Sequence, residues 1–320
     1  MRTILLILFS LLFVGCAQKS PITWEARIIH HQNQPVKLAY DEYGTEHDQT
    51  ILFLHGFGES KHTWRFLVKD LSKKYHLVML DFKGFGESPK IDDDAYSVYD
   101  QAKYVQQFIE EKNLHHLTVV GRSFGGGVSL VMALMQKDRL MEPRIDKIVL
   151  INSMAYKQQL PSMMRYLQQP IIGYVGIHLL SSIWIANEAY HYAFSDDSLI
   201  PPESVDYAAK VMQQPLAKYT YKKTVDVIIP DDILEMQRRY REIRLPILIL
   251  WGREDVSIPV RFAHRLHHEL FNSQLIIYPH VGHMPQEEIP QKVVQGIDDF
   301  MEGKRIEHPF PKRILQEKRH

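Results

Sequence analysis

The chain has 320 residues, and its 38 Lys and Arg residues balance its 38 Asp and Glu residues, so the formal net charge is zero. Nucleic-acid-binding proteins usually hold phosphates with an excess of positive charge, so we expect no nucleic-acid partner. With 45% hydrophobic and 24% charged residues, the composition is typical of a globular protein with a large core, which excludes disordered and collagen-like classes.

The first residues have the pattern of an export signal. Arg2 precedes an apolar run, Ile4 to Val14, that is too short to span a bilayer as a helix. With the FVGC motif that ends at Cys16, this segment resembles a bacterial lipoprotein signal peptide. The resemblance implies removal of residues 1–15, diacylation of Cys16 and attachment to a membrane of the cell envelope. Ala17 after the cysteine implies the outer membrane, facing the periplasm, if the source is Gram-negative.

Two other interpretations of this segment stay open: an ordinary N-terminal membrane anchor, and a cleaved signal with an incidental cysteine.

Cys16 is the only cysteine, so neither an intramolecular disulfide nor a cysteine zinc site can form.

After a polar spacer, residues 16–26, short β-branched runs alternate with amphipathic helical stretches. This alternation predicts a mostly parallel, doubly wound sheet covered by helices on both faces. A long helical insert, residues 154–242, interrupts it and divides the core into residues 27–153 and 243–301. A charged tail, residues 302–320, follows. The predicted strands are Val36–Tyr40, Ile51–Leu54, His76–Leu80, Leu117–Val120, Lys147–Ile151, Ile247–Leu250 and Leu275–Tyr278.

One predicted helix carries its own start signal. Ser97 and Asp100 form a capping-box pattern at the beginning of the helix predicted over Val98 to Glu111.

A serine between glycines marks the candidate chemistry. The sequence GRSFG, with Ser123 at its centre, follows the apolar strand LTVV and precedes the helical stretch GGVSLVMALM. A tight turn between a strand and a helix needs small flanking residues and pushes the serine hydroxyl outward at the strand end. The context therefore predicts a nucleophile elbow with Ser123 as the nucleophile.

Four further motifs follow apolar runs along the chain. Together with GRSFG they are similar to the α/β-hydrolase superfamily, in the branch of esterases, carbon–carbon bond hydrolases and cofactor-free haloperoxidases. The resemblance covers about residues 35–300 and implies the α/β-hydrolase fold, with the insert as a lid. The motifs are His55–Gly58 (HGFG), Asp81–Ser88 (DFKGFGES), Trp251–Asp255 (WGRED) and Val281–Pro285 (VGHMP).

The resemblance also implies roles for individual residues. Ser123 would be the nucleophile, His283 the general base and then acid, and Asp255 the carboxylate that orients the imidazole. The backbone N–H groups of Phe57 and Phe124 would form the oxyanion hole. The order serine, acid, histidine along the chain agrees with this family.

Neighbouring residues offer competing assignments. Glu254 adjoins Asp255, and His280 precedes His283 by three residues, but we expect both to point elsewhere. His55 is expected to shape its loop, and the carboxylate of Asp81 to hold its loop by hydrogen bonds.

A second group of histidines has helical spacing. His264, His267 and His268 could in principle bind a metal, but we interpret them as a polar helix face and expect neither a metal site nor a cofactor.

These features predict a membrane-anchored serine hydrolase of carboxylic esters. A stretch without formal charge apart from His178, Ile171 to Ala186, favours an apolar acyl or aromatic substrate, packing of the lid on the sheet, or a surface that touches the membrane. A hydrolase or acyltransferase acting on carbon–carbon, amide or thioester bonds, and a non-catalytic scaffold lipoprotein, stay as alternatives. The oligomeric state stays open.

Overall fold

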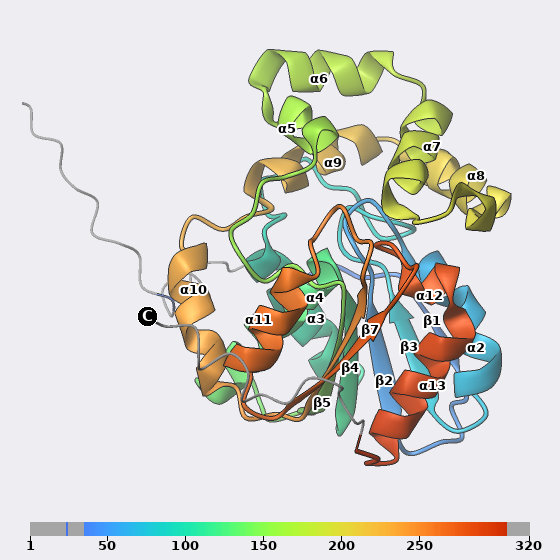
Figure 1. Ribbon diagram of the computed structural model, residues 1–320. Helices are drawn as coiled ribbons and strands as arrows, with labels where there is room; N and C mark the ends of the chain where they lie inside the picture. The colour runs from blue at the N-terminus through green and yellow to red at the C-terminus, as the bar shows by residue number, and fades with distance from the viewer. Residues whose placement is uncertain (1–23, 25–34, 306–320) are drawn as a thin grey trace, which may run out of the picture.

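A single mixed sheet organises the part of the chain that the structure, a computed structural model, describes, namely residues 24 and 35–305. Within these residues the sheet has seven strands in the order β1-β3-β2-β4-β5-β6-β7 (Figure 1). Only β1 runs antiparallel to its neighbour. The strands are β1 (Tyr40–Tyr43), β2 (Thr50–Leu54), β3 (His76–Leu80), β4 (Leu117–Arg122), β5 (Ile145–Ile151), β6 (Ile247–Gly252) and β7 (Ser273–Tyr278).

Six predicted strands agree with β2 to β7 to within two residues at each end, and the parallel sheet predicted from the alternation is confirmed. The strand predicted over Val36–Tyr40 is wrong, because β1 begins at Tyr40. Tyr40 pairs with Leu80, the last residue of β3. Residues before Tyr40 therefore lie beyond the end of β3, where Ala39 instead accepts a hydrogen bond from the N–H of Asp81 and donates to the Ser88 hydroxyl.

Helices cover both faces of the sheet, because alternate strand residues point to opposite sides. On β2, Leu52 and Leu54 belong to one hydrophobic core and Ile51 and Phe53 to another. The predicted capping box at the start of α3 is confirmed. The helices of these two layers are α2 (Arg65–Leu71), α3 (Val98–Glu111), α4 (Phe124–Lys137), α11 (Arg261–Glu269), α12 (Pro285–Glu288) and α13 (Pro290–Met301).

The chain between β5 and β6 is helical. Figure 1 shows α5 to α9 as a separate layer above the sheet, whereas α10 lies beside the core. Ile233 and Met236 of α10 are buried in the core, so the predicted insert of residues 154–242 includes a helix that packs on the body. These helices are α5 (Ser162–Gln168), α6 (Pro170–Leu179), α7 (Ser182–Ala193), α8 (Pro202–Met212), α9 (Ala217–Val227) and α10 (Ile233–Arg239).

No single helix in the described part of the chain is long and apolar enough to cross a bilayer. Taken together, helices α6 and α7 have the length and composition of a membrane span, but the pair is bent by 108°.

The predicted signal peptide, Cys16 and the tail from residue 306 lie outside the described residues. Of the predicted spacer, the structure describes Trp24. This side chain is only 5% exposed, and its ring contacts the edge of Tyr99 with 5.5 Å between the ring centroids. Trp24 therefore belongs to the folded body.

Candidate active site

Ser123 lies on the sharp turn that joins β4 to α4. Its backbone has φ 51° and ψ −115°, a conformation that a residue with a side chain rarely adopts. Hydrogen bonds hold it there: the Ser123 N–H donates to Ile151 O at 3.0 Å, and Ser123 O accepts from the N–H groups of Gly126 at 3.0 Å and Met154 at 2.9 Å. The turn directs the serine side chain toward the layer of insert helices.

The flanking glycines are required by close backbone contacts. A Cβ atom on Gly125 would lie 2.2 Å from Leu54 O and 2.5 Å from His55 O, and one on Gly121 would lie 2.5 Å from Gly125 O. The glycines of GRSFG therefore let α4 start directly against β2.

The structure brings Ser123, His283 and Asp255 together from three separate loops. His283 Nε2 lies 3.1 Å from Ser123 Oγ, and His283 Nδ1 lies 2.7 Å from Asp255 Oδ2. Because a carboxylate only accepts, Nδ1 carries the proton and Nε2 is free to accept the serine hydroxyl proton. All three residues are buried.

Asp255 is held by three further groups. Its Oδ1 accepts from the N–H groups of Ser257 and Ile258, both at 2.8 Å. Its Oδ2 accepts from Asn152 Nδ2 at 2.6 Å, and the same amide contacts Gly282 O at 3.3 Å. Asn152 was missed by sequence reasoning because it belongs to no recognised motif.

Arg122 was also missed, although it stands inside GRSFG. It is 3% exposed, and its Nη2 donates to His283 O at 3.0 Å while Nη1 pairs with Glu59. Burial lowers the pKa of Arg122 to about 10, so it stays charged at neutral pH. Burial also lowers the pKa of His283, the Arg122 charge adds to this, and the Asp255 charge opposes it. A neutral imidazole is what a general base requires.

The two amides expected in an oxyanion hole lie at the loop after β2 and at the first turn of α4. In the described residues, the backbone N–H groups of Phe57 and Phe124 have no hydrogen-bond acceptor. The Phe57 side chain also lines the cavity over Ser123. Both N–H groups are therefore available to a ligand.

The neighbouring candidates have other contacts. His55 is fully buried, with Nδ1 bonded to Gly56 O and Nε2 accepting from the Phe82 N–H, and burial lowers the pKa of His55 to about 3. Asp81 accepts from the N–H groups of Lys61 and Glu87 and so holds its loop.

Glu254 accepts from the N–H of Val281, and the His280 side chain is exposed. His267 Nδ1 contacts Ser273 Oγ at 3.0 Å. Among residues 24 and 35–305, no group of three or more His, Cys, Asp or Glu side chains is arranged to hold a metal ion.

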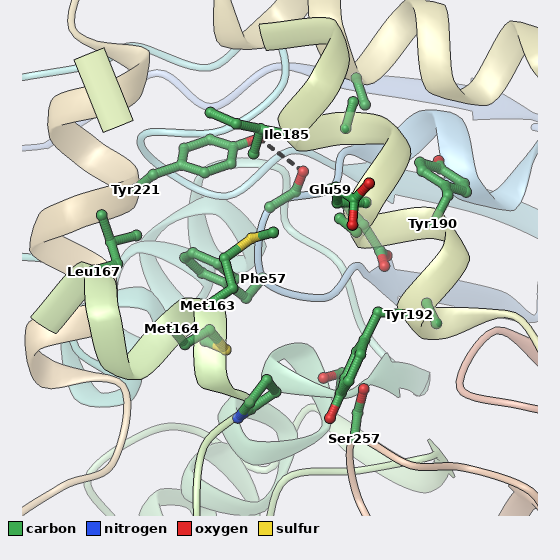
Figure 2. A pocket seen from close by; sticks show the side chains of 18 of the residues that line it. Phe57, Glu59, Met163, Met164, Leu167, Ile185, Tyr190, Tyr192, Tyr221 and Ser257 are labelled. Carbon is green, nitrogen blue, oxygen red and sulfur yellow. Dashed lines mark hydrogen bonds between the residues drawn. The ribbon is translucent and has the colours of Figure 1, made fainter. Parts of the chain in front are cut away.

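A cavity of about 850 Å³ lies over Ser123 and His283. Figure 2 shows Met163, Met164 and Leu167 of α5 facing Tyr190 and Tyr192 of α7 across it. The volume is that of a pocket for a small organic ligand, and the lining is mostly apolar.

Comparisons with known proteins agree with this architecture. A family model described as the alpha/beta hydrolase fold matches residues 49–290. The uncharacterized hydrolase YugF of Bacillus subtilis is 29% identical over 276 residues, which cover 83% of this chain and 94% of YugF.

Human monoacylglycerol lipase ABHD6 is 23% identical over 283 residues, which cover 87% of this chain and 82% of the lipase. The structure of a thermophilic esterase from Thermogutta terrifontis superposes with a TM-score of 0.69 at 20% identity, covering 84% of this chain and 94% of the esterase.

Proposed function

The chain belongs to the α/β-hydrolase family and is a hydrolase of that fold, and on this premise we propose that it cleaves carboxylic esters through an acyl-enzyme. One observation carries the proposal: the hydrogen-bonded series Ser123, His283 and Asp255 stands at the floor of a large apolar cavity.

In the first half of the reaction, His283 Nε2 takes the Ser123 hydroxyl proton as Oγ bonds to the ester carbonyl carbon. The carbonyl oxygen becomes negative and accepts hydrogen bonds from the N–H groups of Phe57 and Phe124. Asp255 stabilises the imidazolium. The carbon–oxygen bond to the alcohol then breaks, and the alcohol leaves with the proton from His283.

In the second half, His283 accepts a proton from water, whose oxygen attacks the acyl carbon. Breakdown of this second intermediate returns the proton to Ser123 Oγ and releases the carboxylic acid. No step needs a cofactor.

The cavity favours an apolar acyl or aromatic substrate. Ile177, Trp184 and Ile185 from the insert line it together with methionines of α5, so burial of a hydrocarbon chain would be favourable along its length. The name of the relative ABHD6, a monoacylglycerol lipase, supports a substrate of this kind.

Comparison of wild type with Ser123→Ala tests the chemistry on p-nitrophenyl esters of increasing acyl length. We expect the variant to lose activity by roughly 1,000-fold or more, and to lose labelling by a fluorophosphonate. Ser129→Ala is the matched control, because this buried serine lies on α4 and its hydroxyl donates to Gly125 O. A folded wild type that neither hydrolyses the esters nor reacts with the label would refute the proposal and direct attention to amide, thioester or carbon–carbon bonds.

We also propose that the mature protein is attached to a bacterial envelope membrane by lipids on Cys16, as the FVGC motif implies. Cys16→Ser should release the mature protein from the membrane fraction or leave an unprocessed precursor. An unchanged size and distribution of the variant would rule out lipidation at this residue.

A further inference from the structure

The outer surface of α6 and the start of α7 exposes apolar side chains to an unusual degree. Ile171 is 78% exposed, Leu179 80% and Ile172 64%, and Tyr174, Val175, Leu180, Ile183 and Trp184 are each more than 40% exposed. We call the exposed apolar side chains between Ile171 and Trp184 the apolar lid face. Elsewhere in the described chain, large exposed apolar side chains such as Leu234 and Phe271 are separated by polar sequence. A contiguous apolar face of this kind marks an interaction surface.

The chemistry of the apolar lid face is that of a membrane-contacting surface. Residues 166–187 contain no Asp, Glu, Lys or Arg, and His178 is their only titratable side chain besides tyrosine. The charged neighbours stand at its borders: Arg165 on α5, Lys218, which donates to Leu180 O, and Glu188 on α7. Tyr and Trp side chains among aliphatic ones are typical of segments that lie at a lipid–water boundary.

The face is continuous with the cavity. Ile172, Leu180 and Trp184 are each more than 40% exposed and also line the space over Ser123. A hydrocarbon chain could therefore pass from an apolar phase outside the lid into the cavity without crossing a charged surface. Figure 1 shows α6 at the outer edge of the layer, with α5 and α9 between it and the core.

The proposed anchor is short enough to keep this face near a bilayer. Seven residues lie between Cys16 and Trp24, and the eight residue steps from one to the other span at most about 29 Å. Trp24 packs on Tyr99 in the first turn of α3. Because α3 follows β3, its first turn lies at the carboxyl edge of the sheet, which is the edge that the insert helices cover.

We infer that the apolar lid face inserts into the lipid surface of the membrane, so that the cavity opens toward the bilayer and takes its ester from there. This inference rests on the proposed function for the source of the substrate and for the anchor. The contact itself requires no turnover, and it can be measured in protein without the lipid anchor.

The absence of any other cysteine makes a site-specific probe possible. The full chain with Cys16→Ser and Leu179→Cys would carry one environment-sensitive fluorophore on the apolar lid face. The matched control is Cys16→Ser with Phe271→Cys, because Phe271 is 73% exposed on the body. Both proteins keep the same N-terminal residues, so any binding through those residues is equal in the two. Thermal unfolding of both labelled proteins shows whether they are folded.

The measurement adds vesicles of phosphatidylcholine and phosphatidylglycerol that carry nitroxide groups on their acyl chains. We expect the probe at position 179 to shift its emission to shorter wavelength and to be quenched, and the probe at position 271 to change little. Equal responses at the two positions would overturn the inference. A shift at position 179 that occurs without vesicles and depends on protein concentration would also overturn the inference, because the face would then be an interface between two copies.

Ester hydrolysis, measured separately with unlabelled wild type, distinguishes the two proposals. Quenching without hydrolysis would leave the membrane contact in place and refute the proposed function. Hydrolysis without quenching would support the proposed function and overturn the inferred membrane contact.

Discussion

At the scale of single residues, Asn152 helps to fix the geometry around Asp255. Its side chain is fully buried and joins three segments, because Nδ2 donates to Asp255 and to Gly282 O, while Oδ1 accepts from the Gly252 N–H at 3.2 Å. Asn152 therefore fixes both the carboxylate and the loop that carries His283. We consider it a positioning residue.

Asn152→Ala should lower kcat by about tenfold to a hundredfold with little change in KM, because a hydrogen bond to a charged group contributes roughly 1.5–3 kcal/mol. Removal of the donor leaves the Asp255 charge less compensated, which raises the pKa of His283. The acid limb of the pH profile of kcat/KM should therefore move to higher pH. In wild type that limb should lie below pH 6.5, because burial lowers the pKa of His283.

The exposed Asn272 provides the control, since Asn272→Ala should change neither kcat nor the profile. A lowered kcat in Asn152→Ala with an unmoved acid limb would mean that Asn152 supports only the fold.

His55 makes a separate prediction about stability, because burial lowers its pKa to about 3 in the folded protein. Between pH 6.5 and 3, the unfolded chain binds a proton at His55 that the folded chain does not. The free energy of unfolding should therefore fall by about 1.4 kcal/mol per pH unit from this residue as the pH drops. Burial raises the pKa of the nearby Asp81 to about 6. The contribution of Asp81 to the free energy of unfolding therefore increases as the pH falls below 6, opposite to that of His55.

Comparison of wild type with His55→Gln separates these effects, because Asp81 is present in both proteins. The variant should be less stable at neutral pH, and the difference in unfolding free energy should narrow as the pH falls from 6.5 to 4. Denaturant titrations at several pH values measure this difference. His116→Gln is the control, because the His116 side chain is 83% exposed. Parallel stability curves for wild type and His55→Gln would contradict the prediction.

At the scale of elements, the contact of α4 with β2 determines where Ser123 stands. Gly125 and Gly127 lie on the same helix, yet a Cβ atom on Gly125 would lie 2.2 Å from Leu54 O, whereas one on Gly127 would meet Met154 O at 3.3 Å. Gly125→Ala should therefore push α4 away from β2.

We expect Gly125→Ala to destabilise the fold by about 1–3 kcal/mol and to abolish most activity, because the Ser123 turn must move. Gly127→Ala should be neutral or stabilising by up to about 1 kcal/mol, because alanine favours a helix over glycine. Thermal unfolding and ester hydrolysis measure both. Equal losses in the two variants would show that general helix packing, not the contact with β2, is responsible.

The elements also show what the sequence could and could not predict. Strands β2 to β7 are mostly apolar and contain buried runs, and local patterns find them. Strand β1 depends on a partner, and its start at Tyr40 follows from where β3 ends. Arg122, Glu59 and Asn152 escape prediction for a similar reason, since each gains its role from a residue far along the chain.

At the scale of the whole molecule, the insert is tied to the loop that carries His283. The His283 N–H donates to Ala193 O at the end of α7, at 2.7 Å. Glu288 of α12 accepts from the N–H and hydroxyl groups of Ser195, just after α7, and from the N–H groups of Gly282 and Met284. One carboxylate thus joins the insert to both neighbours of His283.

The carboxylate of the adjacent Glu287 connects the insert to the body at a second place, away from that loop. It accepts hydrogen bonds from Thr63 and Arg65 of the body and from Ser204 of α8. The two neighbouring carboxylates therefore both connect the insert to the body, but only Glu288 also holds the neighbours of His283.

Glu288→Gln should lower both stability and kcat, because an amide nitrogen in place of one carboxylate oxygen cannot accept from the N–H groups that face it. The loss of stability should be about 1–3 kcal/mol. Glu287→Gln, the matched control, should lose a similar amount of stability and keep most of its kcat, since the His283 loop retains its bonds. Thermal unfolding and hydrolysis of a short, water-soluble ester measure the two effects separately. If Glu288→Gln keeps its kcat, or if both variants lose it equally, the insert does not act on His283 through this carboxylate.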